Sequence, residues 1–179
     1  SIEAGHVVLE VEPVDLRALL DGVAKLFTER ARGGEIGLSI DCPDDIGSLD
    51  MDKRRTKQIL FNLMSNALKF TPREGTVVLG AKREADDGAS LWVADSGIGI
   101  PESDRERVFD KFYTAEHRSR GRAGPGLGLA LVKSFVELHG GRVEIDSTPG
   151  EGTTVACHFP RRPPQGETLM PSIRLVSEN

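Results

Sequence analysis

The sequence predicts an α/β fold, a two-layer sandwich in which a mixed β-sheet packs against helices. Two observations lead to this fold class. Long segments with apolar residues at helical spacing alternate with shorter runs of strand-like residues. Some strand-like runs are joined by short turns, whereas others are separated by a helix, so the sheet should contain both antiparallel and parallel neighbours.

The composition is that of a globular domain with room for a proper core. The chain has 179 residues, of which 38% are hydrophobic and 28% charged. Its net charge of −5 argues against nonspecific binding, and we expect no nucleic-acid partner. Cys42 and Cys157 do not form a disulfide framework or a metal motif, which indicates a reducing compartment.

The sequence contains no targeting or membrane-spanning segment. No run is long and apolar enough for a transmembrane helix, and no signal peptide is present, so we expect a cytoplasmic location. The chain begins at Ser1 rather than at methionine. It is therefore expected to be a piece of a longer parent, which could itself be anchored to the inner membrane.

The first elements are an extended stretch, a helix and a strand. The extended stretch covers His6–Val11, where apolar residues alternate. Asp15 is expected to cap a helix from Leu16 to about Arg32, which Gly33-Gly34 ends. Glu35–Cys42 alternates apolar and polar residues, which is typical of a half-buried strand.

A central helix is predicted from about Asp52 to Phe70, with Asp50 or Asp52 as its cap and Thr71-Pro72 as its end. On a helical wheel the residues expected in the core are Leu60, Leu63, Met64 and Ala67. A second arc holds Arg55, Gln58, Asn62, Asn66 and Lys69. Two amides and an ammonium on successive turns could bind a metal ion and its phosphates. The alternative is a polar face washed by solvent.

The second half of the domain is expected to be richer in strands. The predicted elements are strands at Thr76–Arg83 and Ser90–Asp95, a short helix at Ser103–Lys111, a loop at Thr114–Pro125, a helix at Leu127–His139, and strands at Arg142–Asp146 and Thr153–Phe159.

A first glycine-bearing segment, Asp95-Ser-Gly97-Ile-Gly99-Ile-Pro101, follows a buried strand. The glycines permit a tight turn that a flat ring can approach, and Asp95 could accept a hydrogen bond from an exocyclic amine. The alternative is an Asx turn that merely closes the strand.

A second such segment, Gly121-Arg-Ala-Gly124-Pro-Gly126-Leu-Gly128-Leu-Ala, leads into a helix. Free backbone N–H groups and the positive end of the helix could receive phosphates there. The segment is neither a Rossmann motif, since no βαβ unit surrounds it, nor a Walker loop, since Gly-Lys-Ser/Thr is absent. The alternative is a flexible loop before a helix.

Taken together, these segments resemble the catalytic, ATP-binding domain of sensor histidine kinases, which shares its fold with gyrase, Hsp90 and MutL-type ATPases. Asn62–Pro72 looks like the N box of that family, and Asp95–Pro101 looks like its G1 box. Val108–Tyr113 is similar to the F box, Gly124–Ala130 to the G2 box, and Gly150–Thr154 to the last glycine motif. The motifs occur in family order over roughly residues 12 to 160. The resemblance implies a Bergerat-type ATP-binding fold.

The resemblance also implies roles for matching residues, with ATP and Mg²⁺ as cofactors. Asn66 would ligate Mg²⁺ through its amide oxygen, which is a hard ligand for a hard ion. Asn62 would lie beside the γ-phosphate, and Lys69 would contact phosphate as a point charge. Phe70 would pack near the adenine, and Asp95 would accept its N6 amine.

Further nucleotide contacts are implied along the two glycine segments and in the last glycine motif. They are Gly97, Ile98, Gly99, Gly124, Gly126, Leu127, Gly128 and Thr153. The segment Thr114–Pro125 would be a mobile lid, in which Arg118, Arg120 or Arg122 could meet phosphate charge. Phe109 and Phe112 would anchor the root of the lid in the core.

The implied function is that of a protein histidine kinase fragment which lacks its acceptor residue. None of the four histidines lies in the family's acceptor context, a helical hairpin with an acidic neighbour. Residues 1–12 would be a linker from an upstream dimerisation hairpin, 13–160 the catalytic domain, and 161–179 a flexible tail. Expected partners are that hairpin and a response regulator or phosphotransfer protein, with a homodimeric parent and a fragment that can be monomeric.

Two rival functions stay open. Pro125 lacks the N–H that a G2-box residue could donate to phosphate, and Thr114 stands where the family often has a basic residue. Both changes would suit a degenerate pseudokinase or scaffold that signals through protein partners. An ATPase of the gyrase or Hsp90 kind is disfavoured, because the amide of Asn62 cannot take a proton from water as a glutamate can.

Overall fold

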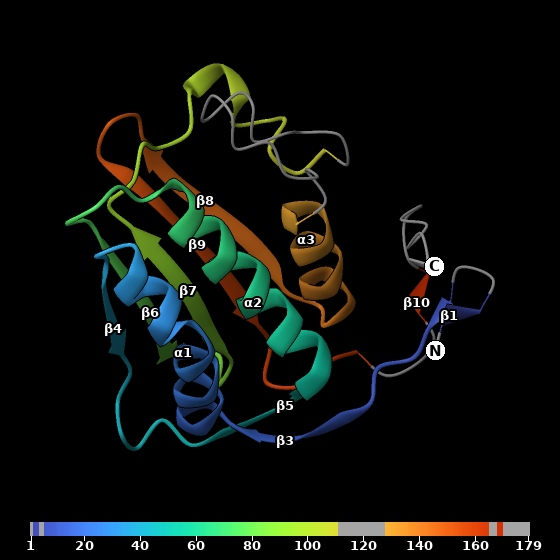
Figure 1. The fold of residues 1–179 in the computed structure, drawn as a ribbon. Helices are drawn as coiled ribbons and strands as arrows, with labels where there is room; N and C mark the ends of the chain where they lie inside the picture. Colours follow the sequence, from blue (N-terminus) through green and yellow to red (C-terminus); the bar gives the residue numbers. More distant parts are fainter. Residues whose placement is uncertain (1, 4–5, 111–127, 165–167, 170–179) are drawn as a thin grey trace.

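The computed structural model describes residues 2–3, 6–110, 128–164 and 168–169 (Figure 1). Its elements, in chain order, are β1 (Ile2–Glu3), β2 (His6–Val7), β3 (Val11–Asp15), α1 (Leu16–Gly33), β4 (Gly37–Asp41), β5 (Ser48–Asp52), α2 (Lys53–Phe70), β6 (Thr76–Arg83), β7 (Ala89–Asp95), a 3-10 turn η1 (Glu102–Asp104), α3 (Gly128–Leu138), β8 (Arg142–Thr148), β9 (Gly152–Phe159) and β10 (Thr168–Leu169).

The main sheet has five strands in the order β4-β6-β7-β9-β8. β4 pairs with β6 in parallel, and the other neighbours are antiparallel, so the sheet is mixed. α1, α2 and α3 lie on one face of this sheet, with α2 between the other two (Figure 1). The predicted two-layer α/β sandwich is therefore confirmed.

The core lies between the sheet and the three helices. The four α2 residues predicted to face the core are all buried, and Leu60 and Met64 have no exposed surface. Leu79 and Leu91 of the sheet are also fully buried. Burial of a side chain of this size stabilises the fold by roughly 1.5–3 kcal/mol, so this layer of contacts holds α2 against the sheet.

Side chains cap the helices as the sequence predicts. Asp15 Oδ1 accepts a hydrogen bond from the Ala18 N–H at 3.0 Å, and Asp52 Oδ1 accepts one from the Arg55 N–H at 3.0 Å. Asp52, rather than Asp50, is thus the cap of α2. Thr71 ends the helix in an extended conformation, with φ −94° and ψ 124°, as expected for a residue before proline.

Strand β5 is absent from the predicted elements, and it forms a second, two-stranded sheet with β3. Its two aspartates, Asp50 and Asp52, were candidates for the cap of the next helix, but Leu49 and Met51 alternate with them and are buried. The extended stretch predicted at His6–Val11 is correspondingly wrong in extent. Its last residue begins β3, which pairs with β5 over five residue pairs, whereas His6–Val7 forms β2.

The short helix predicted at Ser103–Lys111 is also wrong over the residues described. After η1 the chain continues in turns whose hydrogen bonds span three residues rather than four, as from the Arg107 N–H to the Asp104 carbonyl. The segment is short and mostly charged, and a helix of this length is marginal without a broad apolar face. Val108 is nevertheless buried, and it attaches these turns to the core.

The N- and C-terminal segments meet in a third, small sheet. β2 pairs with β1 and with β10, both antiparallel. No helix in the described parts of the chain is both long and apolar enough to cross a membrane.

Candidate functional site

The predicted nucleotide residues converge where α2, β7, β9 and the start of α3 meet. A cavity of about 20 Å³ there is lined by Leu63, Asn66, Ala67, Val93, Asp95, Ile100, Leu129, Thr153 and Val155. A volume of this size holds about one water molecule. The cavity therefore brings an amide, a carboxylate and a hydroxyl together among apolar walls.

The amides on α2 face the first residue of α3. Asn62 Nδ2 donates to the Gly128 carbonyl at 3.4 Å, and Asn62 Oδ1 accepts from Gln58 Nε2 at 2.8 Å. An ideal Cβ on Gly128 would lie 3.5 Å from Asn66 Nδ2. Asn62 and Asn66 are both half-buried, so this stripe is not the fully solvated face that was the alternative.

The last turn of α2 carries Lys69 and Phe70. The Lys69 ammonium lies 5.7 Å from the centre of the Phe70 ring, and Phe70 itself is buried. The Phe70 carbonyl accepts a hydrogen bond from the Ile98 N–H at 3.3 Å. The end of α2 is thus joined to the loop that follows β7.

Asp95 ends β7 and pairs with Val77 of β6 on one side and with Thr153 of β9 on the other. Its Oδ1 accepts a hydrogen bond from the Gly97 N–H at 2.9 Å, which is an Asx turn. The turn is therefore real, and it also fixes the carboxylate at the cavity that Asn66 lines.

The glycines of the loop after β7 are required by the protein's own backbone. A Cβ on Gly97 would lie 2.5 Å from the Phe70 carbonyl oxygen. Gly99 has φ +74°, and a Cβ there would lie 2.4 Å from the Thr148 carbonyl oxygen. The loop is pressed between the end of α2 and the β8–β9 turn, while Ile98 is 40% exposed between the two glycines.

The side chain of Thr153 is held by a second hydroxyl group, that of Ser147, which no sequence motif indicated. Ser147 Oγ and Thr153 Oγ1 lie 2.8 Å apart, and the Ile100 N–H donates to Ser147 Oγ at 2.8 Å. Both hydroxyl residues are buried. A serine in a strand carries no local signal of this role, because its partners come from other strands and loops.

Several predicted residues lie outside the described part of the chain. They are Arg118, Arg120, Arg122, Gly124, Gly126 and Leu127, together with Phe112, Thr114 and Pro125 of the same region. Phe109 is described, and it is partly buried against the core with the Lys133 ammonium 5.5 Å from its ring centre.

Comparison with known proteins places this chain in a family. The model of a family described as histidine kinase-, DNA gyrase B- and HSP90-like ATPase matches residues 51–163. The circadian input-output histidine kinase CikA of Synechococcus elongatus is 44% identical over 165 residues, which cover 90% of this chain and 22% of CikA.

Solved structures show the same likeness. Full-length ShkA in complex with AMPPNP matches with a TM-score of 0.79 and 31% identity, over 89% of this chain and 33% of ShkA. Histidine kinase ThkA in complex with the response regulator protein TrrA matches with a TM-score of 0.73 and 26% identity, over 87% of this chain and 43% of that chain.

The chain therefore belongs to the family of histidine kinase-, DNA gyrase B- and HSP90-like ATPases. Its curated relatives are histidine kinases, and within the family the chain is an ATP-binding catalytic domain of that kind. It spans 22% of the length of its relative CikA, so it corresponds to one part of such a kinase.

Proposed function

We propose that this domain binds ATP together with Mg²⁺ and presents the γ-phosphate to an acceptor histidine outside residues 1–179. The observation that carries the proposal is the cavity that brings Asn66 of α2 to Asp95 of β7 and Thr153 of β9. These residue types suit the two ends of a nucleotide, a metal-bound triphosphate and an amine-bearing base.

Asp95 would recognise the adenine. Its carboxylate is held at the floor of the cavity by the Gly97 N–H, and it would accept a hydrogen bond from the N6 amine. Thr153 stands beside it in the sheet register, and Phe70 and Ile98 would give apolar contacts at the same end.

Asn66 and Lys69 would hold the phosphates. Within the described residues no three His, Cys, Asp or Glu side chains cluster to hold a metal ion by themselves. An amide oxygen, phosphate oxygens and water are a ligand set that suits Mg²⁺, so Asn66 fits this ion. When bound, Mg²⁺ would neutralise phosphate charge, and the Lys69 ammonium would add a positive charge at the same end of the nucleotide.

Asn62 would favour transfer over hydrolysis. Its oxygen accepts from Gln58 and its nitrogen donates to Gly128, and an amide cannot act as the base that removes a proton from water. Phosphoryl transfer depends on positioning and charge neutralisation, and the nucleophile can come from another segment.

The proposed parent is a homodimeric sensor kinase in which residues 1–12 link this catalytic domain, residues 13–160, to a phosphoacceptor hairpin. A response regulator or a phosphotransfer protein would then receive the phosphoryl group. The likeness to ThkA bound to TrrA supports this partner class.

Calorimetry with ATP, with and without Mg²⁺, tests the binding roles. Asn66→Ala should remove the gain in affinity that Mg²⁺ gives, whereas Asp95→Ala should remove the preference for ATP over GTP. Ser65→Ala and Asp146→Ala are matched controls, because Ser65 bonds to Arg30 and Asp146 is exposed on β8. Unchanged binding by both site variants would refute the assigned roles.

Phosphorylation of the longer parent chain tests the transfer step. With radiolabelled ATP, an acid-labile phosphoryl group should form and should be lost in the Asn66→Ala variant. Tight ATP binding without any such product would favour the pseudokinase, for which Pro125 and Thr114 are the motivation. Rapid phosphate release by the isolated domain would instead indicate an ATPase.

A further inference from the structure

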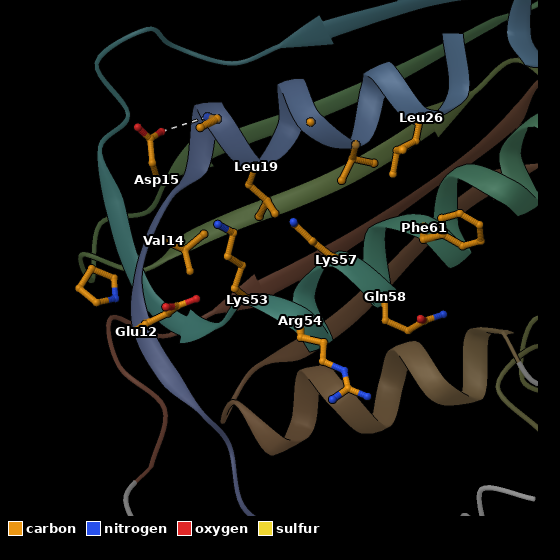
Figure 2. A pocket seen from close by; sticks show the side chains of 14 residues that line it. Glu12, Val14, Asp15, Leu19, Leu26, Lys53, Arg54, Lys57, Gln58 and Phe61 are labelled. Atoms are coloured by element: carbon orange, nitrogen blue, oxygen red, sulfur yellow. Dashed lines mark hydrogen bonds between the residues drawn. The ribbon is translucent and has the colours of Figure 1, made fainter. Parts of the chain in front are cut away.

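A groove of about 930 Å³ lies between β3, α1 and α2 and shares no lining residue with the candidate nucleotide site (Figure 2). Its base is apolar, formed by Val14, Leu19 and Val23, which are all buried. Two large apolar side chains stand above this base in solvent, since Leu26 is 71% exposed and Phe61 is 46% exposed. Exposed apolar side chains gathered in one hollow are typical of an interaction surface.

The α2 wall and the α1 wall of the groove would both allow a partner to approach closely. Phe61 is held by Phe27, whose ring centre lies 5.1 Å away at an angle of 50°. Gly22 lies inside α1 on the groove wall, and no heavy atom lies within 4 Å of an ideal Cβ there. Glycine is unfavourable in a helix interior, and no neighbour within the described structure requires it. A missing side chain at this position lets another backbone approach α1 closely.

The α2 side of the groove is positively charged. Lys53, Arg54 and Lys57 line it, all three are exposed, and none forms an ion pair within the described part of the chain. Lys53 and Lys57 point from α2 towards α1, above the apolar base (Figure 2). The carboxylate of Asp15, on the other side, is already engaged as the cap of α1. These three basic side chains therefore form a locally positive surface on a chain whose net charge is −5.

We propose that this groove is the docking site of an acidic amphipathic helix from a protein partner. The apolar face of that helix packs on Leu26 and Phe61 and passes α1 at Gly22. Its carboxylates pair with Lys53, Arg54 and Lys57, which form no ion pair among the described residues; the groove's own carboxylates, Glu12 and Asp15, lie on the β3 side. A helix fits better than an added strand, because Pro13 gives the neighbouring β3 one backbone donor fewer.

Docking in the groove does not require a bound nucleotide, since no lining residue of the groove lines the small cavity. One hydrogen bond links the groove to a residue of the candidate nucleotide site. Gln58 lines the groove and donates to Asn62 Oδ1 at 2.8 Å. An occupied groove would therefore contact the residue that orients an amide of the candidate nucleotide site. This link rests on the proposed function, whereas docking itself does not.

The test uses a synthetic helical peptide of about 14 residues, long enough to follow the groove wall from Ala18 to Leu26, roughly 12 Å of helix. One face carries leucines at helical spacing and the flanks carry glutamates. Titration into the ¹⁵N-labelled 179-residue chain should shift the backbone amide signals of α1 and the first half of α2. Lys57→Glu should weaken binding about fivefold, and the lysine-bearing version of the peptide should recover it.

Matched variants separate groove contacts from general effects. Gly22→Gln should abolish the shifts, whereas Gly33→Gln, which also meets nothing within 4 Å but lies outside the groove, should leave them unchanged. Lys25→Glu is the charge control, because Lys25 is exposed on α1 and does not line the groove. Circular dichroism confirms that each variant is folded.

Three results would overturn the proposal. Shifts that map to Asn66 and Asp95 would place the peptide at the other site. Equal affinity for the glutamate and lysine peptides would show that charge plays no part in recognition. Self-association of the chain that Gly22→Gln abolishes would assign the groove to a second copy.

Discussion

The backbone N–H of Asp52 donates a hydrogen bond to His139 Nε2 over 3.0 Å and so joins the start of α2 to the end of α3. Because Nε2 is the acceptor, the ring proton is on Nδ1, which donates to the Phe135 carbonyl at 2.7 Å. The Asp52 carboxylate accepts from the Arg55 side chain and from the N–H groups of Arg55 and Glu10. One buried cluster thus orients the helix that carries Asn62 and Asn66.

Replacing His139 should destabilise the domain strongly. His139→Ala removes both ring hydrogen bonds, leaves the Asp52 N–H buried without its acceptor and opens a cavity, because His139 is 1% exposed. We expect a loss of about 3 kcal/mol in the free energy of unfolding, measured by urea denaturation. His158→Ala, on the sheet, should cost about 1 kcal/mol. Equal losses in the two variants would contradict the role given to the cluster.

Stability should also fall as the pH drops below about 6.5, and His139 is the reason. Burial lowers the pKa of His139 from its ordinary value of 6.5, so the unfolded chain takes up this proton before the folded chain does. The stability that neutral His139 contributes to the folded chain is complete above pH 6.5. It is lost as the pH falls towards the lower pKa that His139 has in the folded chain.

Asp52 acts in a different pH window. Burial raises the pKa of its carboxyl, but hydrogen bonds from Arg55 and Glu10 outweigh burial and hold the pKa below 3.8. The stability that Asp52 contributes is therefore lost only below about that pH.

Urea denaturation between about pH 7.5 and about pH 4.5 tests the role of His139. The free energy of unfolding should decline in wild type over this range, and the decline should be smaller in His139→Ala. The same decline in both proteins would assign it to other groups.

Local sequence patterns predicted the elements whose contacts are local. Asp15 was predicted as a cap, Asp52 was one of two candidates for the next cap, and β6 occupies the predicted Thr76–Arg83. β5 escaped prediction because its partner β3 lies far away in sequence and aspartates interrupt its apolar residues. The helix predicted after Pro101 was wrong because its local pattern was weakly helical but offers no broad apolar face to bury.

Some residues of the candidate site could likewise be predicted from local sequence, and others could not. Asn66, Asp95 and Thr153 could be proposed from motifs, and the fold brings them to one cavity. The contribution of Ser147 and the link between Asp52 and His139 depend on residues from distant segments, and nothing local signals such pairs. The charged groove beside α1 could not be predicted from the sequence either, because its walls come from three separate elements.

Gly80→Ala should destabilise the sheet and change the fluorescence of Trp92, the single tryptophan. Gly80 pairs with Trp92 across β6 and β7, and a Cβ there would lie 2.1 Å from the indole ring. The indole must move, at a cost of about 1–3 kcal/mol. Gly37→Ala is the control, since its nearest heavy atom would lie 3.6 Å away. Equal stability and identical emission spectra would contradict the predicted clash.

The two thiols should differ sharply in reactivity. Cys157 is fully buried, and burial raises its pKa to about 12, so almost no thiolate forms near neutral pH. Cys42 is half-buried, and its pKa is raised mainly by burial. Ellman's reagent should modify one thiol in the folded protein and both in urea. Cys42→Ser should abolish the native reaction, and a remaining fast reaction would show that Cys157 is accessible.

Replacing the amide at position 62 by a carboxylate should turn the domain towards hydrolysis, if the proposed function is correct. Asn62 lies between Gln58 and the Gly128 carbonyl and offers no base to an attacking water. Asn62→Glu would supply one, and we expect ATP turnover to rise about tenfold or more, measured as phosphate release. Ser65→Glu introduces a carboxylate elsewhere on α2, at a residue that contacts Arg30 of α1, and should leave turnover at the wild-type level. A rise in Ser65→Glu alone, or in neither variant, would show that position 62 does not face the attacking water.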